Sequence, residues 1–218
     1  MTLNLSDLEA SARQHGWSTA IASVGEIRIA ARYLGWKEVP TREGEPTVAD
    51  LRPTNQQDAL PHSLSATYGT GAQPLHTDGA HLADPPDLVI VCADEPNNTP
   101  TLIWTVLSDA GHPPGLWTNA ADGVFLVNNG PNSFFTTVRW ASGIRYDPGC
   151  MEACDQRARH VAQFFEEAAA DTHRYDWGAA NQVLVIDNRK TLHARAAVPD
   201  HDMSRLLHRI AFSTKKPQ

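Results

Sequence analysis

Short apolar segments separated by turn-forming residues dominate this chain, and they limit the folds that it can adopt. The longest apolar segment with strand character lies at residues 88–93, and 14 Gly and 15 Pro in 218 residues provide frequent turns. Segments of this length and composition are typical of β-strands. We expect nine strands, at residues 17–24, 48–51, 63–68, 87–93, 100–106, 124–128, 133–139, 182–186 and 206–212.

Three helices are expected beside these strands. Residues 6–15 begin with a capping box formed by Ser6 and Glu9. Residues 25–33 and 151–169 carry apolar side chains at helical spacing. Many short strands with few helices fit a rolled antiparallel architecture better than alternating strand–helix units. The sequence therefore predicts a mainly β fold with flanking helices, namely a double-stranded β-helix, or jelly roll.

The length of the chain favours a single domain. With 218 residues it is long enough to bury a core and stays within the usual size of one domain. We expect one domain over residues 1–218, in which residues 1–60 form a helical and loop annexe packed on the barrel and residues 61–218 form the jelly-roll core. Residues 38–62 are rich in Pro, Glu and Thr, so this segment is expected to be a surface loop with one short strand.

Charge and composition exclude several classes of partner. A net charge of -7 argues against nucleic-acid binding. The apolar segment at residues 88–93 is too short to cross a bilayer, and residues 1–7 lack the basic start and apolar stretch of a secretory signal. An odd number of cysteines, Cys92, Cys150 and Cys154, does not indicate a disulfide framework. We expect a cytoplasmic protein with no nucleic-acid or membrane partner, and its oligomeric state stays open.

The segment LHTDGAH at residues 75–81 offers candidate metal ligands. His76 and Asp78 are two residues apart, which places both side chains on one side of an extended backbone. This spacing is common by chance, so a third ligand is needed. His193 is the candidate, because an apolar strand at residues 182–186 and a polar turn lead into it. Two histidines and one carboxylate suit non-haem Fe(II) and leave positions for a chelating cosubstrate and O2.

Two arginines downstream of His193 indicate an anion. Arg205 and Arg209 are four residues apart, so on a strand they would share one face. Inside a barrel such a cation needs an anion, because an unpaired buried charge is costly. Two alternatives stay open for the anion of Arg209: a small acid that the protein binds, or an internal carboxylate such as Asp147 or Asp187.

Several weak signals follow one another in a fixed order along the chain. They are His76-Thr77-Asp78, Pro85-Pro86, Thr101-Leu102-Ile103-Trp104, Asp187-Asn188-Arg189 before His193, and then Arg205 and Arg209. In combination they resemble the Fe(II)- and 2-oxoglutarate-dependent oxygenases of the taurine dioxygenase and clavaminate synthase type. The resemblance extends from residue 60 to residue 212, although Leu75 stands where tryptophan is frequent in that family.

This resemblance implies a metal site with a cosubstrate site beside it. His76, Asp78 and His193 would hold Fe(II). Arg205 would bind the distal carboxylate of 2-oxoglutarate, with the Thr101 hydroxyl as its helper. A guanidinium suits this task because it fixes a carboxylate in one orientation through two hydrogen bonds, which lysine does less well.

The resemblance also implies a small-molecule substrate. Arg209 resembles the substrate-side arginine of some members, and Ser65, in the hydroxyl-rich segment at residues 63–68, is a further candidate for substrate contact. His81 and His62 flank the metal-binding segment and are candidates too. We expect a small anionic or zwitterionic metabolite, most of all an amino acid or its derivative. Its oxidation at an unactivated carbon would consume O2 and release succinate and CO2.

Other functions stay open on the sequence alone. A barrel of the same ancestry that binds a small anion without turnover would carry similar residues. A zinc hydrolase would use the same three ligands, but it has no role for Arg205 with Thr101. An oxygenase of this type can also desaturate or cyclise its substrate instead of hydroxylating it.

Overall fold

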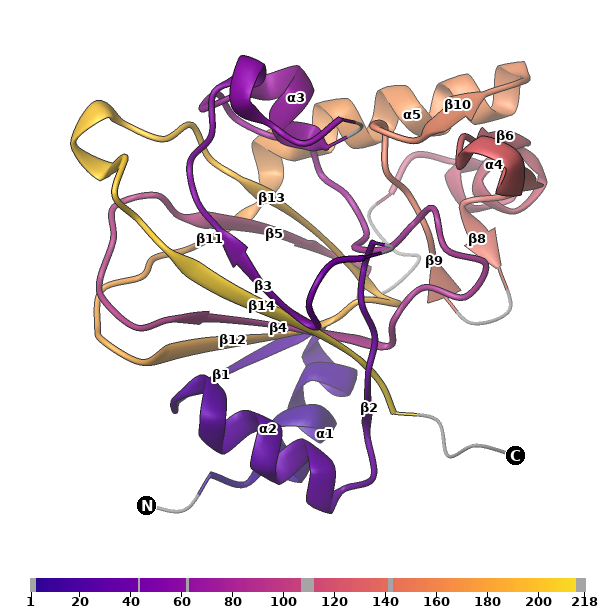
Figure 1. Cartoon of the computed structure of the whole chain (residues 1–218). Helices are drawn as coiled ribbons and strands as arrows, with labels where there is room; N and C mark the ends of the chain where they lie inside the picture. Colours follow the sequence, from indigo (N-terminus) through magenta and orange to yellow (C-terminus); the bar gives the residue numbers. More distant parts are fainter. Residues whose placement is uncertain (1–2, 43, 62, 107–111, 141–142, 215–218) are drawn as a thin grey trace.

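Two antiparallel sheets lie face to face in this protein, with helices on their outer sides (Figure 1). The computed structural model describes residues 3–42, 44–61, 63–106, 112–140 and 143–214. The larger sheet has the strand order β1-β12-β4-β14-β2, and β3 also pairs with β14. Its strands are β1 (Trp17–Ile21), β2 (Lys37–Glu38), β3 (Val48–Leu51), β4 (Leu88–Ala93), β12 (Gln182–Asp187) and β14 (Leu207–Ser213).

The second sheet is smaller and has the order β11-β5-β13. In it, His193 of β13 lies opposite Ile103 of β5. Short strands form two further groups, in which β6 pairs with β7 and β10, and β8 pairs with β9. These strands are β5 (Thr101–Thr105), β6 (Phe125–Val127), β7 (Phe134–Thr136), β8 (Arg139–Trp140), β9 (Gly143–Ile144), β10 (Met151–Ala153), β11 (His173–Tyr175) and β13 (Thr191–Arg195).

Three buried apolar clusters hold these layers together. Between the two sheets, Val91 of β4 and Ile103 of β5 belong to one cluster. On the other face of the larger sheet, α1 and α2 bury side chains such as Ile27. The outer face of the second sheet packs against α5, where the rings of Trp104 and Phe165 lie 5.2 Å apart between centroids. The longer helices are α1 (Leu5–His15), α2 (Val24–Tyr33), α4 (Leu116–Asp122) and α5 (Gln156–Ala168).

Successive side chains of β14 lie in different buried clusters. Leu207 and Ala211 face the cluster between the sheets, whereas Ile210 and Phe212 face the cluster under α1 and α2. Because successive side chains of a strand point to opposite faces, Arg209 shares the inner face with Leu207 and Ala211. The alternation that the sequence predicts is therefore present from Leu207 onwards, whereas Arg205 lies before β14 begins.

The prediction of a mainly β protein with flanking helices is confirmed. Strands β1, β3, β4, β5, β12 and β14 lie within or overlap their expected segments, and so do β6 and β7, which pair with each other. Within the described residues no helix is long and apolar enough to cross a membrane. The three cysteines are free.

The strand expected at residues 63–68 is wrong. Leu64–Tyr68 form a short helix, α3, and the Ser63 hydroxyl accepts a hydrogen bond from the Ala66 backbone N–H at its start. Serine favours this position because its side chain satisfies a backbone donor that the first turn of a helix leaves free. The alternation of small hydroxyls therefore reflects helix capping and not a strand with two faces.

Two further helix predictions need correction at their ends. The helix expected over residues 151–169 is a short strand, β10, followed by α5, whose start is capped by the Asp155 side chain. The first helix is capped by Asn4, whose side chain accepts from the Asp7 backbone N–H, and not by a box formed by Ser6 and Glu9. In both helices the side chain of the residue before the first turn, Asn4 or Asp155, accepts a hydrogen bond from a backbone N–H that the helix leaves free.

Candidate metal centre and its cavity

A short antiparallel bridge brings His76 and His193 together. Each residue donates its backbone N–H to the carbonyl of the other, and both hydrogen bonds are 3.0 Å long. The sequence places His193 at the end of a polar turn, but it lies inside β13, which pairs along its length with β5. The backbone of His193 is therefore held by hydrogen bonds on both sides.

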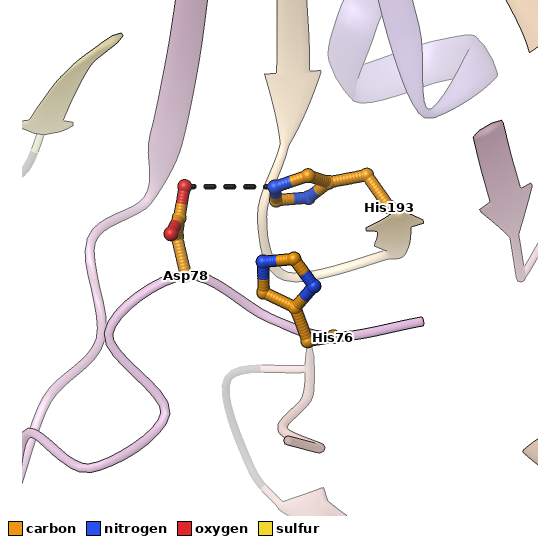
Figure 2. Close-up of side chains that lie close together, drawn as sticks. All are labelled: His76, Asp78 and His193. Carbon is orange, nitrogen blue, oxygen red and sulfur yellow. Dashed lines mark ion pairs between the residues drawn. The ribbon is translucent and has the colours of Figure 1, made fainter. Parts of the chain in front are cut away.

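Asp78 completes a cluster of three potential metal ligands, as Figure 2 shows. One ligand atom from each of His76, Asp78 and His193 lies within 4.8 Å of the others. The three residues are 9%, 4% and 8% exposed, in that order. The Asp78 Oδ2 atom is 3.6 Å from His193 Nε2 and has no hydrogen-bond partner among the described residues. Two imidazoles and a buried carboxylate oxygen with no partner fit a divalent transition metal.

The Asn188 side chain fixes the backbone of Asp78. Its amide oxygen accepts from the Asp78 N–H at 3.1 Å, and its amide nitrogen donates to the carbonyls of Asp78 and Pro86 at 3.0 and 2.9 Å. The next residue, Gly79, has a φ of +69°, and a Cβ there would lie 2.9 Å from the Pro86 ring. A glycine is required at this turn because other residues would be strained and would collide.

The His76 ring is held in the form that a metal needs. Its Nδ1 atom lies 3.1 Å from the Pro74 carbonyl oxygen, and a donor there leaves Nε2 without a proton. Burial lowers the pKa of His76, and the neighbouring His193 lowers it further. Both effects favour the neutral imidazole, which is the form that binds metals.

Arg209 contacts the carboxylate of Asp78 directly. Its Nη1 donates to Asp78 Oδ1 at 2.7 Å, and its Nη2 donates to the Thr41 hydroxyl at 2.6 Å. Burial alone would raise the pKa of Asp78, but Arg209 and the two imidazoles outweigh it and hold the pKa below its usual range. The sequence suggests a bound acid, Asp147 or Asp187 as the anion of Arg209, and the structure supplies Asp78 instead.

Arg205 lies in the same cavity with a different environment. It is 6% exposed, and its guanidinium has no carboxylate partner within hydrogen-bond distance in the described part of the chain. Burial lowers the pKa of Arg205 to about 10, and Arg195 contributes to this shift. The side chain stays charged at neutral pH, and a buried cation of this kind is costly unless an anion binds it.

The Thr101 hydroxyl is prepared to donate a hydrogen bond. Its oxygen accepts from Trp177 Nε1 at 3.2 Å, and Thr101 is itself buried. A hydroxyl oxygen that already accepts keeps its proton for an acceptor elsewhere. An anion beside Thr101 would therefore receive this proton as a hydrogen bond.

One cavity of about 770 Å³ is lined by all of the predicted site residues that the structure describes. Its walls come from both sheets and from the segment between β2 and α3. His62 lies outside the described residues. The predicted site residues in its lining are Ser65, His76, Asp78, His81, Thr101, His193, Arg205 and Arg209.

Sequence reasoning missed several residues of this cavity. Thr41 and Arg42 lie in the segment that we expected to be a surface loop, yet both line the cavity. Arg195, whose Nη2 donates to the carbonyls of Gly69 and Gly71, also lines it. Sequence carried no periodic signal for these residues, since their positions depend on tertiary packing of a segment without long elements.

The sequence matches no family model and no curated protein. Solved structures do share its fold. An asparagine oxygenase with Fe(II), 2S,3S-3-hydroxyasparagine and succinate has a TM-score of 0.72 and 15% identity, over 94% of this chain and 78% of that chain. The non-haem iron oxygenase OrfP with Fe, succinate and (3S)-hydroxy-L-Arg has a TM-score of 0.71 and 14% identity, over 97% and 80%. PvcB from Pseudomonas aeruginosa has a TM-score of 0.65 and 16% identity, over 96% and 80%.

Proposed function

We propose that this protein is an Fe(II)- and 2-oxoglutarate-dependent oxygenase that hydroxylates a small amino acid or a related small acid. One observation carries the proposal: three buried metal-ligand candidates and the buried Arg205 line the same cavity. The asparagine oxygenase and OrfP, which have the same fold, are seen with iron and succinate. A metal and a guanidinium that has no carboxylate partner within hydrogen-bond distance among the described residues, both in one cavity, are the arrangement that a chelating dicarboxylate requires.

Each group has a defined task in this proposal. His76, Asp78 and His193 hold Fe(II), which when bound would supply the oxidising chemistry of O2 while 2-oxoglutarate is converted to succinate and CO2. Arg205 binds the terminal carboxylate of 2-oxoglutarate through two N–H groups, and Thr101 donates its hydroxyl proton to the same carboxylate. Both groups are buried, and burial strengthens such contacts because the local dielectric constant is lower than in water.

The cavity suits a small molecule with charges of both signs. Its volume of about 770 Å³ falls within the common range for small-molecule sites, roughly 300 to 1,000 Å³. Asp147 and Arg42 both line it, so an ammonium and a carboxylate would each meet an opposite charge. Ser65 and His81 are the other proposed substrate contacts, whereas Arg209, also expected to contact the substrate, already donates to Asp78 and Thr41. The hydroxylated amino acids bound to the asparagine oxygenase and to OrfP support this substrate class.

The finer description of the fold belongs to the same proposal. We infer that the two facing sheets form a double-stranded β-helix in a single domain over residues 1–218, with residues 1–60 as an annexe that also adds β1, β2 and β3 to the larger sheet. The TM-scores of 0.72 and 0.71 with the two oxygenases support this architecture. The proposed location is the cytoplasm, on composition alone.

The test is substrate-stimulated release of succinate. The purified protein would be supplied with Fe(II), 2-oxoglutarate and O2 and with each of a panel of amino acids and small acids, beginning with asparagine and arginine. We expect one member to stimulate succinate release and to gain one oxygen atom in its mass. His193→Ala is the control, which should show no stimulation. If the native protein binds no Fe(II) and no compound stimulates succinate release, the proposal is wrong; a product that loses two hydrogens would replace hydroxylation by desaturation.

A further inference from the structure

We infer that Arg209 is a positioning residue that orients the carboxylate of Asp78: it binds Oδ1 and leaves Oδ2 for the metal. The inference rests on the proposed metal centre and concerns how its carboxylate is held. Oδ1 accepts from Arg209 Nη1 at 2.7 Å. Oδ2 is buried without a hydrogen-bond partner among the described residues and lies 3.6 Å from His193 Nε2. The two oxygens of one carboxylate therefore have separate environments.

The guanidinium is itself held in place from two directions. In the larger sheet, Arg209 on β14 lies opposite Val91 on β4 and Ala49 on β3, so the strand cannot shift without breaking both ladders. At its tip, Nη2 donates to the Thr41 hydroxyl at 2.6 Å, and Thr41 is buried. A planar guanidinium fixed at one nitrogen by Thr41 presents the other in a fixed direction to Asp78.

The backbone of Asp78 is fixed independently of its side chain. Asn188 holds its N–H and its carbonyl, so the carboxylate has only its side-chain torsions left. Figure 2 shows the resulting arrangement, with one Asp78 oxygen directed at the His193 ring. A charge-assisted hydrogen bond to Oδ1 then settles which oxygen turns towards the imidazoles.

This assignment has a consequence for the number of open metal positions. With Oδ1 bound to Arg209, Asp78 would offer the metal one oxygen, and a six-coordinate metal held by the three protein ligands would keep three positions open. A carboxylate that used both oxygens would occupy one of these positions. The Arg209 contact would therefore keep open the metal coordination positions that a chelating cosubstrate and O2 need.

The test uses Co(II) alone, without 2-oxoglutarate or substrate, because the visible absorption of Co(II) reports its coordination. In Arg209→Met we expect a changed Co(II) spectrum and a loss of Co(II) affinity of about 10- to 100-fold, the usual effect of removing a partner of a metal ligand. Arg209→Lys, which keeps a charge and one donor, should recover part of the affinity. The matched control is Arg195→Met, an arginine of the same cavity whose Nη2 donates to Gly69 and Gly71, and its Co(II) spectrum should be native.

Thr41→Val provides a mild variant that keeps Arg209 and nearly preserves volume. It should shift the Co(II) spectrum in the same direction and lower the affinity by about 2- to 10-fold, because one anchor of the guanidinium is lost. A native spectrum and affinity in both Arg209→Met and Thr41→Val would overturn the inference, and so would tighter binding with a native spectrum. A native protein that binds neither Co(II) nor Fe(II) would overturn the proposed function together with it.

Discussion

Arg205 and Arg209 line one cavity and differ in what their guanidinium groups meet. Arg209 has Asp78 at 2.7 Å and Thr41 at 2.6 Å, whereas Arg205 has no carboxylate partner in the described part of the chain. The two residues are four apart in sequence and of the same type. The comparison teaches that a buried arginine gains its role from the partner that tertiary structure supplies, and that the arginine without a partner is the better candidate for an external anion.

The largest effect is expected from removing Asp78, the carboxylate partner that distinguishes Arg209 from Arg205. Asp78→Ala should abolish metal binding and leave Arg209 as a second cation without a carboxylate, at a cost of about 3 kcal/mol in unfolding free energy. Metal content and urea denaturation measure the two effects. His193→Ala is the matched control, because it should lose the metal but keep the ion pair. Equal stability of native and Asp78→Ala proteins would show that the pair contributes nothing.

The second prediction concerns Arg205, the arginine without a carboxylate partner in the described part of the chain. Arg205→Met should weaken 2-oxoglutarate binding by about 2 to 4 kcal/mol, which is at least about 30-fold, because a charge-assisted bidentate contact is lost. Titration of the metal-loaded protein with 2-oxoglutarate measures it. The ligand-free variant should be as stable as the native protein or more so, since a buried uncompensated charge is removed. Native affinity in Arg205→Met would contradict the assignment of this residue.

The smallest effect is expected from pH. Because burial and then His193 lower the pKa of His76 in the folded state, the unfolded chain binds more protons below about pH 6.5. The metal-free protein should therefore lose stability as the pH falls below that value, by at most about 1.4 kcal/mol per pH unit from this group. Urea denaturation at several pH values measures the slope, which should shrink in His76→Gln.

Arg205→Met is the control for the predicted pH dependence. The slope of stability against pH should be native in this variant, because the guanidinium that the substitution removes does not titrate in the tested range. A slope that changes equally in Arg205→Met and His76→Gln would mean that His76 is not its source.

The parts of the fold that could be predicted are those with a repeating pattern. The six apolar residues of β4 are all buried, since the sheet is covered on both faces, and this makes the strand easy to recognise. The strand prediction for residues 63–68 was wrong because a serine that caps a helix and a serine on a strand look alike when only alternation is counted. Short pieces such as β8 and β9 carry too few residues for any period to show.

The candidate site could be predicted to a similar extent. The ligand set followed from residue types and order, as His76, Asp78 and His193 do lie together. The partners of these ligands could not be predicted. The contact between Arg209 and Thr41 joins residues 168 positions apart, and nothing in either local sequence indicates it. Sequence patterns report which side of a strand a residue occupies, but not which distant side chain meets it there.

The Asn188 contact to Asp78 spans 110 residues of sequence and ties the turn after His76 to the turn before His193. Contacts between such distant segments form late in folding, because closing a long loop costs entropy before the contact repays it. The candidate metal ligands thus come together only when the segments around residues 76–78 and 188–193 have met. A partly folded chain would hold the proposed Fe(II) weakly, so the metal, with its capacity to generate oxidants, would be captured only after these segments have folded together.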